Sequence, residues 1–190
     1  MKKVFIFIWE LVKVTVVSLA IILPVRYFLI QPFYVKGASM EPNFYNHEYL
    51  IIDQLSYRFR EPVRGEVIVF RYPRNPQEHF IKRIIAMPNE SIEIKDGEVI
   101  IYNDTYPDGF KLDEHYLSEE YMLLNSEERV DLSADEFYVL GDNRSSSMDS
   151  RSFGPLNESF ITGRVFFRGL PFNRVTLFTK APDFGGINLE

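Results

Sequence analysis

The N-terminal segment is the feature that most restricts how this chain can fold. From Val4 to Ile30 nearly every residue is apolar, with three charged residues as interruptions. A helix needs about 20 predominantly apolar residues to cross the hydrocarbon core of a bilayer, and this segment supplies them. We therefore expect residues 1–30 to form a membrane anchor and residues 31–190 to form one folded domain.

A cleaved signal peptide is the alternative interpretation of this segment, because its cleanest apolar stretch, residues 14–23, is short. The following residues, 24–29, include a proline, an arginine and bulky side chains, and they do not make a small-residue cleavage site. Lys2 and Lys3 precede the apolar stretch and favour a cytoplasmic N-terminus. The sequence therefore favours an uncleaved single span with the domain outside the cytoplasm.

Charge is unevenly distributed along the chain. The 21 basic and 27 acidic residues give a net charge of -6, and this acidic balance argues against nucleic-acid binding. Counting by segment, residues 1–30 have four basic and one acidic residue, whereas residues 103–136 have two basic and eleven acidic ones. We interpret residues 103–136 as an acidic insert, a solvated excursion that holds a short helix. The absence of cysteine excludes disulfides, thiolate metal sites and a cysteine nucleophile.

Strand-like runs rich in Val, Ile, Phe and Tyr follow the anchor, separated by Pro, Gly, Asn and Arg. The pair Asp96-Gly97 is typical of a tight hairpin turn. No helical periodicity of useful length occurs between residues 48 and 102, so we predict a mainly β fold with an antiparallel sheet. The predicted strands are Glu48–Asp53, Glu66–Tyr72, His79–Met87, Ser91–Ile101, Phe137–Leu140 and Gly163–Arg168.

Common catalytic templates do not fit this sequence. It has no His-Glu-x-x-His signature and no Gly-rich phosphate loop, and Ser39 is not in a Gly-x-Ser-x-Gly elbow. The three histidines, His47, His79 and His115, lie apart in ordinary contexts, and we expect them at exposed polar positions.

Ser39 and Lys82 offer a route to catalysis without histidine. Ser39 follows the anchor within residues 37–42, where small neighbours let a ligand approach the backbone. Strand alternation sets Lys82 on the same face as the apolar Phe80 and Ile84. Burial can lower a lysine pKa by up to about 3 to 5 units, which yields a neutral amine able to act as general base toward serine. Alternatively, Lys82 lies on an edge strand and extends to water.

A polar loop over residues 141–151 follows the strand at 137–140. By composition this cluster of Gly, Asp, Asn and Ser is an ordinary loop. In a functional interpretation it supplies a hydroxyl that orients the lysine amine, while Asp149 and Arg151 pair to hold the loop.

Four motifs in this order, after an apolar N-terminal segment, resemble those of bacterial type I signal peptidases. They are Gly-Ala-Ser-Met-Glu-Pro at 37–42, Arg-Gly-Glu-Val-Ile-Val-Phe at 64–70, Phe-Ile-Lys-Arg-Ile-Ile at 80–85, and Gly-Asp-Asn-Arg with Asp-Ser-Arg within 141–151. The resemblance implies a membrane-anchored serine endopeptidase that removes signal peptides from exported preproteins at the outer face of the bacterial cytoplasmic membrane. It also implies contact with the lipid bilayer and no metal or organic cofactor.

The resemblance assigns roles to individual residues. Ser39 would be the nucleophile, and its backbone N–H would help to hold the oxyanion. Lys82 would be the general base, Ser147 would hydrogen-bond to the Lys82 amine, and Gly141 would let the lysine chain pass close.

The same resemblance assigns supporting and substrate-binding residues. Asp149 with Arg151 would brace the loop beneath the site. Pockets for small side chains, one and three residues before the cut, would be lined by apolar residues, namely Phe33, Val35, Phe44, Phe80 and Ile81. We also expect apolar residues close to the site, such as Met40 and Phe44, to touch lipid.

Two positions depart from the family pattern. Gly37 stands where some members have a serine whose hydroxyl helps to hold the oxyanion, so the Ser39 N–H would carry more of that stabilisation. Residues 86–90 replace a glycine-containing turn, and we expect Asn89 to take the left-handed conformation there.

Two other functions remain open from the sequence. One is a related peptidase that matures a single partner, which substrate breadth would distinguish. The other is a membrane-tethered β-domain that binds peptides without cutting them, although the presence of Ser39, Lys82 and Ser147 argues against it.

Overall fold

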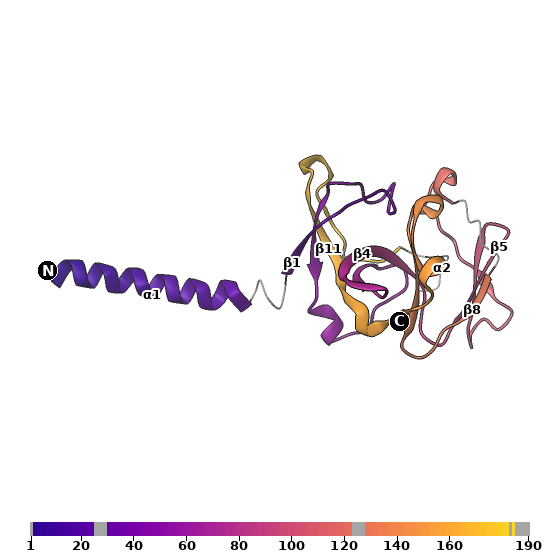
Figure 1. The fold of residues 1–190 in the computed structure, drawn as a ribbon, viewed down its shortest axis with the longest axis horizontal. Helices are drawn as coiled ribbons and strands as arrows, with labels where there is room; N and C mark the ends of the chain where they lie inside the picture. The colour runs from indigo at the N-terminus through magenta and orange to yellow at the C-terminus, as the bar shows by residue number, and fades with distance from the viewer. Residues whose placement is uncertain (1, 25–29, 123–127, 183, 185–190) are drawn as a thin grey trace.

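A long, exposed helix precedes the β-rich part of the chain. A computed structural model describes residues 2–24, 30–122, 128–182 and 184. Helix α1 spans Lys2–Pro24 and stands clear of the strands in Figure 1. Within Lys2–Leu23 an 18-residue window has a mean hydropathy of 2.3, and no part of that window is buried inside the protein. By length and composition α1 can cross a bilayer.

The larger sheet contains most of the strands. These are β1 (Ile30–Tyr34), β2 (Tyr49–Asp53), β3 (Val67–Tyr72), β4 (Asn75–Ala86), β9 (Glu136–Leu140), β10 (Leu156–Asn157), β11 (Ile161–Leu170) and β12 (Thr176–Leu177). Their order is β1-β2-β11-β3-β4-β9-β10, with β12 paired to β11. Every paired neighbour in this sheet is antiparallel, which confirms the predicted fold class.

Several strands differ from the sequence prediction: β10 and β12 were not predicted, and β4 and β1 differ for identifiable reasons. β4 begins at Asn75, four residues before the predicted start at His79, because the chain pairs with β3 almost from the turn onward. β1 was not predicted either, and it contains Pro32, a residue type that is rare inside strands. A proline is tolerated there because β1 is at the edge of the sheet, where one side of the backbone needs no partner.

The interior strand β3 shows how the larger sheet is covered on both faces. Val67 and Val69 point into one apolar cluster, and Ile68 and Phe70 point into another. All four are at most 8% exposed. Because consecutive side chains in a strand point to opposite faces, a continuous apolar run fits a strand buried on both sides.

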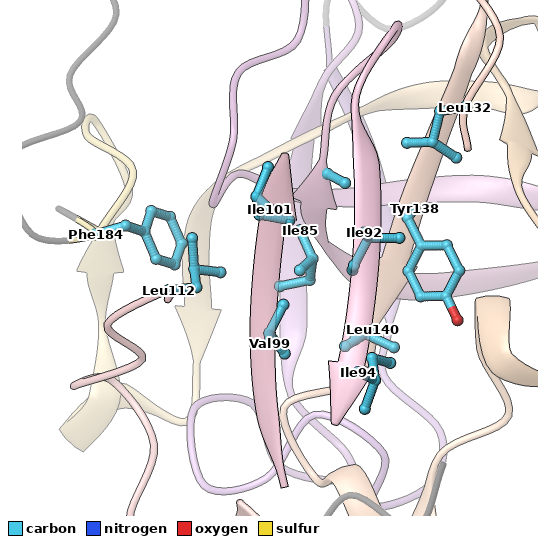
Figure 2. Close-up of a cluster of buried hydrophobic side chains, with 11 residues drawn as sticks. Ile85, Ile92, Ile94, Val99, Ile101, Leu112, Leu132, Tyr138, Leu140 and Phe184 are labelled. Carbon is cyan, nitrogen blue, oxygen red and sulfur yellow. The ribbon is translucent and has the colours of Figure 1, made fainter. Parts of the chain in front are cut away.

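The smaller sheet packs against β4 and β9. It consists of β7 (Phe110–Lys111), β6 (Glu98–Tyr102), β5 (Ser91–Lys95) and β8 (Glu128–Asp131), in that order. Asp96 and Gly97 join β5 to β6, both with positive φ, as a type I′ hairpin turn requires. Figure 2 shows the cluster that joins the sheets, including Ile92 and Val99 from the smaller sheet and Ile85 from β4.

Short helical turns connect several strands. The described residues include α2 (Ser150–Phe153) and the 3₁₀ turns η2 (Ser56–Arg58), η3 (Glu119–Tyr121), η4 (Arg144–Ser146), η5 (Glu158–Phe160) and η6 (Phe172–Arg174).

The acidic insert, residues 103–136, is more integrated than the predicted solvated excursion. It contributes β7 and β8 to the smaller sheet, and Leu112, Leu117 and Leu132 are buried. The prediction was wrong on this point because it weighed the net charge and not the spaced apolar residues that pack on the sheet. The short helix expected there corresponds to η3, while residues 123–127 lie outside the described part of the chain.

Gly97→Ala should lower the free energy of unfolding by about 1 to 2 kcal/mol, because an L-residue is strained at the φ of +81° found there. A Cβ at this position would meet nothing within 4 Å, so the cost comes from the backbone alone. Denaturant unfolding of the detergent-solubilised protein measures it. Asp96→Asn is the control and should be nearly neutral, whereas equal stability of wild type and Gly97→Ala would refute the turn assignment.

Candidate active site

Ser39 and Lys82 meet although they are 43 residues apart in sequence. The Lys82 Nζ donates hydrogen bonds to Ser39 Oγ at 2.8 Å and to the Ile81 carbonyl oxygen at 2.7 Å. Gly37, at φ +94°, turns the chain after β1, and its N–H donates to Asn46 Oδ1 at 3.1 Å. This turn and strand β4 together bring a hydroxyl and an amine into direct contact.

Lys82 is buried on an interior strand. β4 lies between β3 and β9, and Lys82 is 3% exposed. The alternative of an edge-strand lysine reaching water is therefore wrong. Burial lowers the pKa of Lys82 from its ordinary 10.5 to about 8, while the negative charges of Asp149 and Asp142 partly oppose this effect. A substantial fraction of the amine is consequently neutral near physiological pH.

Ser147 and Gly141 lie close to the site, but the hydrogen bond predicted for Ser147 is absent. The Ser147 Oγ is buried without a hydrogen-bond partner, so the predicted bond to the Lys82 amine is not formed. Gly141 makes room for Ser147 and for the Ser39 backbone, since a Cβ there would collide with Ser147 Oγ and lie 2.5 Å from the Ser39 carbonyl oxygen. The three atoms nearest to such a Cβ belong to Ser147 and Ser39, and the role of Gly141 beside the lysine chain stays a prediction.

The loop that follows β9 is hydrogen-bonded to the Ser39 turn and contains an ion pair of its own. The Asn143 backbone N–H donates to the Ser39 carbonyl oxygen at 3.0 Å. Asp149 accepts hydrogen bonds from the Arg151 guanidinium at 2.8 Å and from the Gly141 N–H at 3.0 Å. Asp149 and Arg151 therefore pair as the sequence predicted, and their pair holds the loop beneath Lys82.

A cleft of about 700 Å³ opens at Ser39 and Lys82. Four of the five predicted pocket residues line it, namely Phe33, Val35, Phe80 and Ile81. Phe44 does not line this cleft. It is 1% exposed, packs beside Phe178 and faces a second cavity, because the turn after Ser39 directs its side chain into the core.

Two further predictions near the site have clear outcomes. Met40 and Phe44 are each 1% exposed, so the expectation that these residues touch lipid is wrong. Asn89 has a φ of +63°, the left-handed conformation expected for the turn after β4.

The histidines are exposed as expected, but one of them lies in the cleft. His79 lines it, and its ring centroid is 5.3 Å from that of Phe33, which lines the cleft as well. Local sequence patterns do not indicate this position, because strand alternation sets residues 79 and 82 on opposite faces of β4. Glu78 and Lys36 also line the cleft and make its rim polar.

Comparisons with known proteins place these features in a family. Residues 8–170 match the family described as signal peptidase, peptidase S26. Probable signal peptidase I-2 of Synechocystis sp. is 35% identical, over 95% of this chain and 82% of that protein. Signal peptidase I of Bacillus amyloliquefaciens is 30% identical, over 92% of this chain and 93% of that protein. A crystal structure of a signal peptidase I from Enterococcus faecalis aligns with a TM-score of 0.47 and 27% identity, covering 56% of this chain and 97% of that one.

Asp149→Asn should lower the pKa of Lys82 below its value of about 8, because the Asp149 charge raises that pKa. Titration of ¹³Cε-labelled lysine by NMR measures the shift in detergent micelles. Asp108→Asn, a change at an exposed position of the acidic insert, is the matched control and should leave Lys82 unaltered. A Lys82 pKa that stays the same or rises in Asp149→Asn would contradict the electrostatic account.

Proposed function

We propose that this chain, which belongs to the signal peptidase family, peptidase S26, cleaves signal peptides with Ser39 as nucleophile and Lys82 as general base. As a member of this family the chain is a serine peptidase of the type I signal peptidase class. The observation that carries the proposal is the 2.8 Å contact between the Lys82 Nζ and Ser39 Oγ, inside an apolar cleft that can hold a peptide.

The first chemical step is acylation of Ser39. The neutral Lys82 amine removes the hydroxyl proton as Oγ attacks the scissile carbonyl carbon, and the resulting ammonium then protonates the leaving amine. The C–N bond of the substrate breaks, and the signal peptide remains as an ester on Ser39. Burial of Lys82 supports this role, because a neutral amine is needed at the start of the cycle.

The second step is hydrolysis of the ester. Lys82, neutral again, removes a proton from water as the water attacks the ester carbonyl, and it returns the proton to Ser39 Oγ. In both steps the backbone N–H of Ser39 would donate to the oxyanion. Gly37 has no side chain to help, so the oxyanion depends more strongly on backbone donors.

The cleft suggests how substrates are chosen. Phe33, Val35 and Ile81 form apolar walls near Ser39, and Leu50 also lines the cleft. Bulky walls leave room for small side chains next to the scissile bond. We therefore infer that preproteins with small residues one and three positions before the cut are the preferred substrates.

Helix α1 supports a membrane-bound enzyme. Its exposed apolar surface needs a nonpolar environment, and its length suits a single span as an uncleaved anchor. Lys2 and Lys3 favour a cytoplasmic N-terminus. The catalytic part of the chain, from residue 31 onward, would then face the outer side of the bacterial cytoplasmic membrane, where exported preproteins emerge.

Ser39→Ala and Lys82→Met should each reduce the rate of preprotein cleavage by at least about 10⁴-fold, since nucleophile and base act as one unit. The assay uses a preprotein with an Ala-x-Ala site in liposomes, with product fragments separated on gels. Lys95→Met, a change in the exposed β5–β6 hairpin, serves as the matched lysine control and should cleave the preprotein at the wild-type rate. Cleavage that survives Lys82→Met would require another base.

The cleavage rate should rise with pH through about 8 and level off above it, because only the neutral Lys82 amine accepts the Ser39 proton. Below this pKa the protonated amine predominates, so kcat/KM should fall by about tenfold per pH unit. Initial rates between pH 6 and 10 at low substrate concentration measure the profile. A flat profile from pH 6 to 9 would rule out a lysine base with this pKa.

A further inference from the structure

One carboxylate of the acidic insert is buried while its neighbours are exposed. Glu114 is 8% exposed, whereas Asp113, Glu119 and Glu120 are exposed to solvent. Both oxygens of Glu114 accept hydrogen bonds from the guanidinium of Arg144, whose side chain is fully buried. Burying a charged pair costs desolvation free energy, which the attraction between the two charges does not always repay. The buried location of Glu114 therefore calls for a reason.

Arg144 connects Glu114 to the loop beneath Lys82. Its Nε donates to the Gly141 carbonyl oxygen at 2.9 Å, and its own carbonyl oxygen accepts from Arg151 Nη2 at 2.7 Å. Gly141 is the residue packed against Ser147 and the Ser39 backbone. The conformation of this loop next to the nucleophile is therefore fixed in part by a residue that Glu114 holds.

Tyr116 extends the connection to strand β4 and to the turn that follows Ser39. Its hydroxyl donates to Glu114 Oε1 at 2.7 Å, and its ring lies 4.2 Å from the guanidinium carbon of Arg83, the neighbour of Lys82. Its carbonyl oxygen accepts from Asn43 Nδ2 at 3.2 Å, in the turn that follows Ser39.

The buried charged residues around Tyr116 form two ion pairs. Arg83 binds Asp142 through two hydrogen bonds, at 2.8 and 2.6 Å, and Arg144 binds Glu114. All four residues are at most 8% exposed. Loss of the Glu114 charge would leave one buried guanidinium unpaired beside the other, and the local structure would have to rearrange to hydrate or re-pair it.

We propose that Glu114 is a positioning residue for catalysis, which keeps Ser39 and Lys82 correctly placed relative to each other through Arg144 and Tyr116. This inference rests on the proposed function and gives the acidic insert a role in it. Glu114 touches neither the cleft nor the reacting atoms, and the described residues that line the cleft include none from the insert. Its influence should therefore fall on the chemical step and not on substrate binding.

Glu114→Gln in the full-length enzyme should lower kcat by about 10- to 100-fold with little change in KM, because a small displacement of the reacting groups strongly lowers the rate of the chemical step. Glu114→Asp, which keeps the charge, should recover part of the loss. Tyr116→Phe removes only the hydroxyl that joins Glu114 and Arg144, and we expect a milder fall in kcat, of about three- to tenfold. This second variant keeps the test informative if Glu114→Gln folds poorly.

Two controls separate positioning from a general loss of stability. Glu119→Gln makes the same chemical change at an exposed site of the insert and should keep wild-type kcat. The ¹³Cε resonance of Lys82 should move in folded Glu114→Gln and stay in place in Glu119→Gln, with near-UV circular dichroism verifying the fold of each variant. A general destabilisation would not move this resonance in the folded molecules.

The outcomes distinguish this inference from the proposed function. If the wild type cuts preproteins and Ser39→Ala does not, while Tyr116→Phe and folded Glu114→Gln retain wild-type kcat and an unmoved Lys82 resonance, the positioning role is wrong and the peptidase assignment holds. If the wild type itself cuts no preprotein, the proposed function fails. In that case a Lys82 resonance that still moves in Glu114→Gln supports the structural link alone.

Discussion

The contact between a buried amine and a serine hydroxyl is the interaction on which the rest of this structure depends. Lys82 is useful as a base only if it is withdrawn from water, yet an isolated buried ammonium is expensive. The interior position of β4 provides the burial, and the cleft leaves Ser39 half-exposed to a peptide. The larger sheet thus supports one buried lysine beside one accessible hydroxyl.

Buried ion pairs surround this contact and explain why so many charges are found inside a small domain. Asp149 and Asp142 lie near enough to act on Lys82, and each is neutralised by an arginine. Removing one partner of a buried pair typically costs about 3 to 5 kcal/mol, so these pairs are a fixed framework. Glu114 extends the framework into the acidic insert, which explains why a segment rich in carboxylates is joined to the core.

Local sequence patterns predicted the parts of the fold that depend on local physics. Asp96-Gly97 specifies a hairpin because few other residues adopt positive φ, and the catalytic candidates followed from motifs in the expected order. What escaped prediction depends on distant partners. The edge location that permits Pro32 in β1, the inward orientation of Phe44, and the burial of Glu114 against an arginine thirty residues later are set by tertiary packing.

The most direct test of the central claim is the reaction of the enzyme with a peptide phosphonate ester that ends in an Ala-x-Ala sequence, followed by mass spectrometry of the modified peptide. The account predicts one adduct, on Ser39, that forms faster as pH rises through about 8 and is lost in Lys82→Met. An adduct on another residue, or undiminished modification of Ser39 in Lys82→Met, would contradict the proposed pairing of hydroxyl and amine.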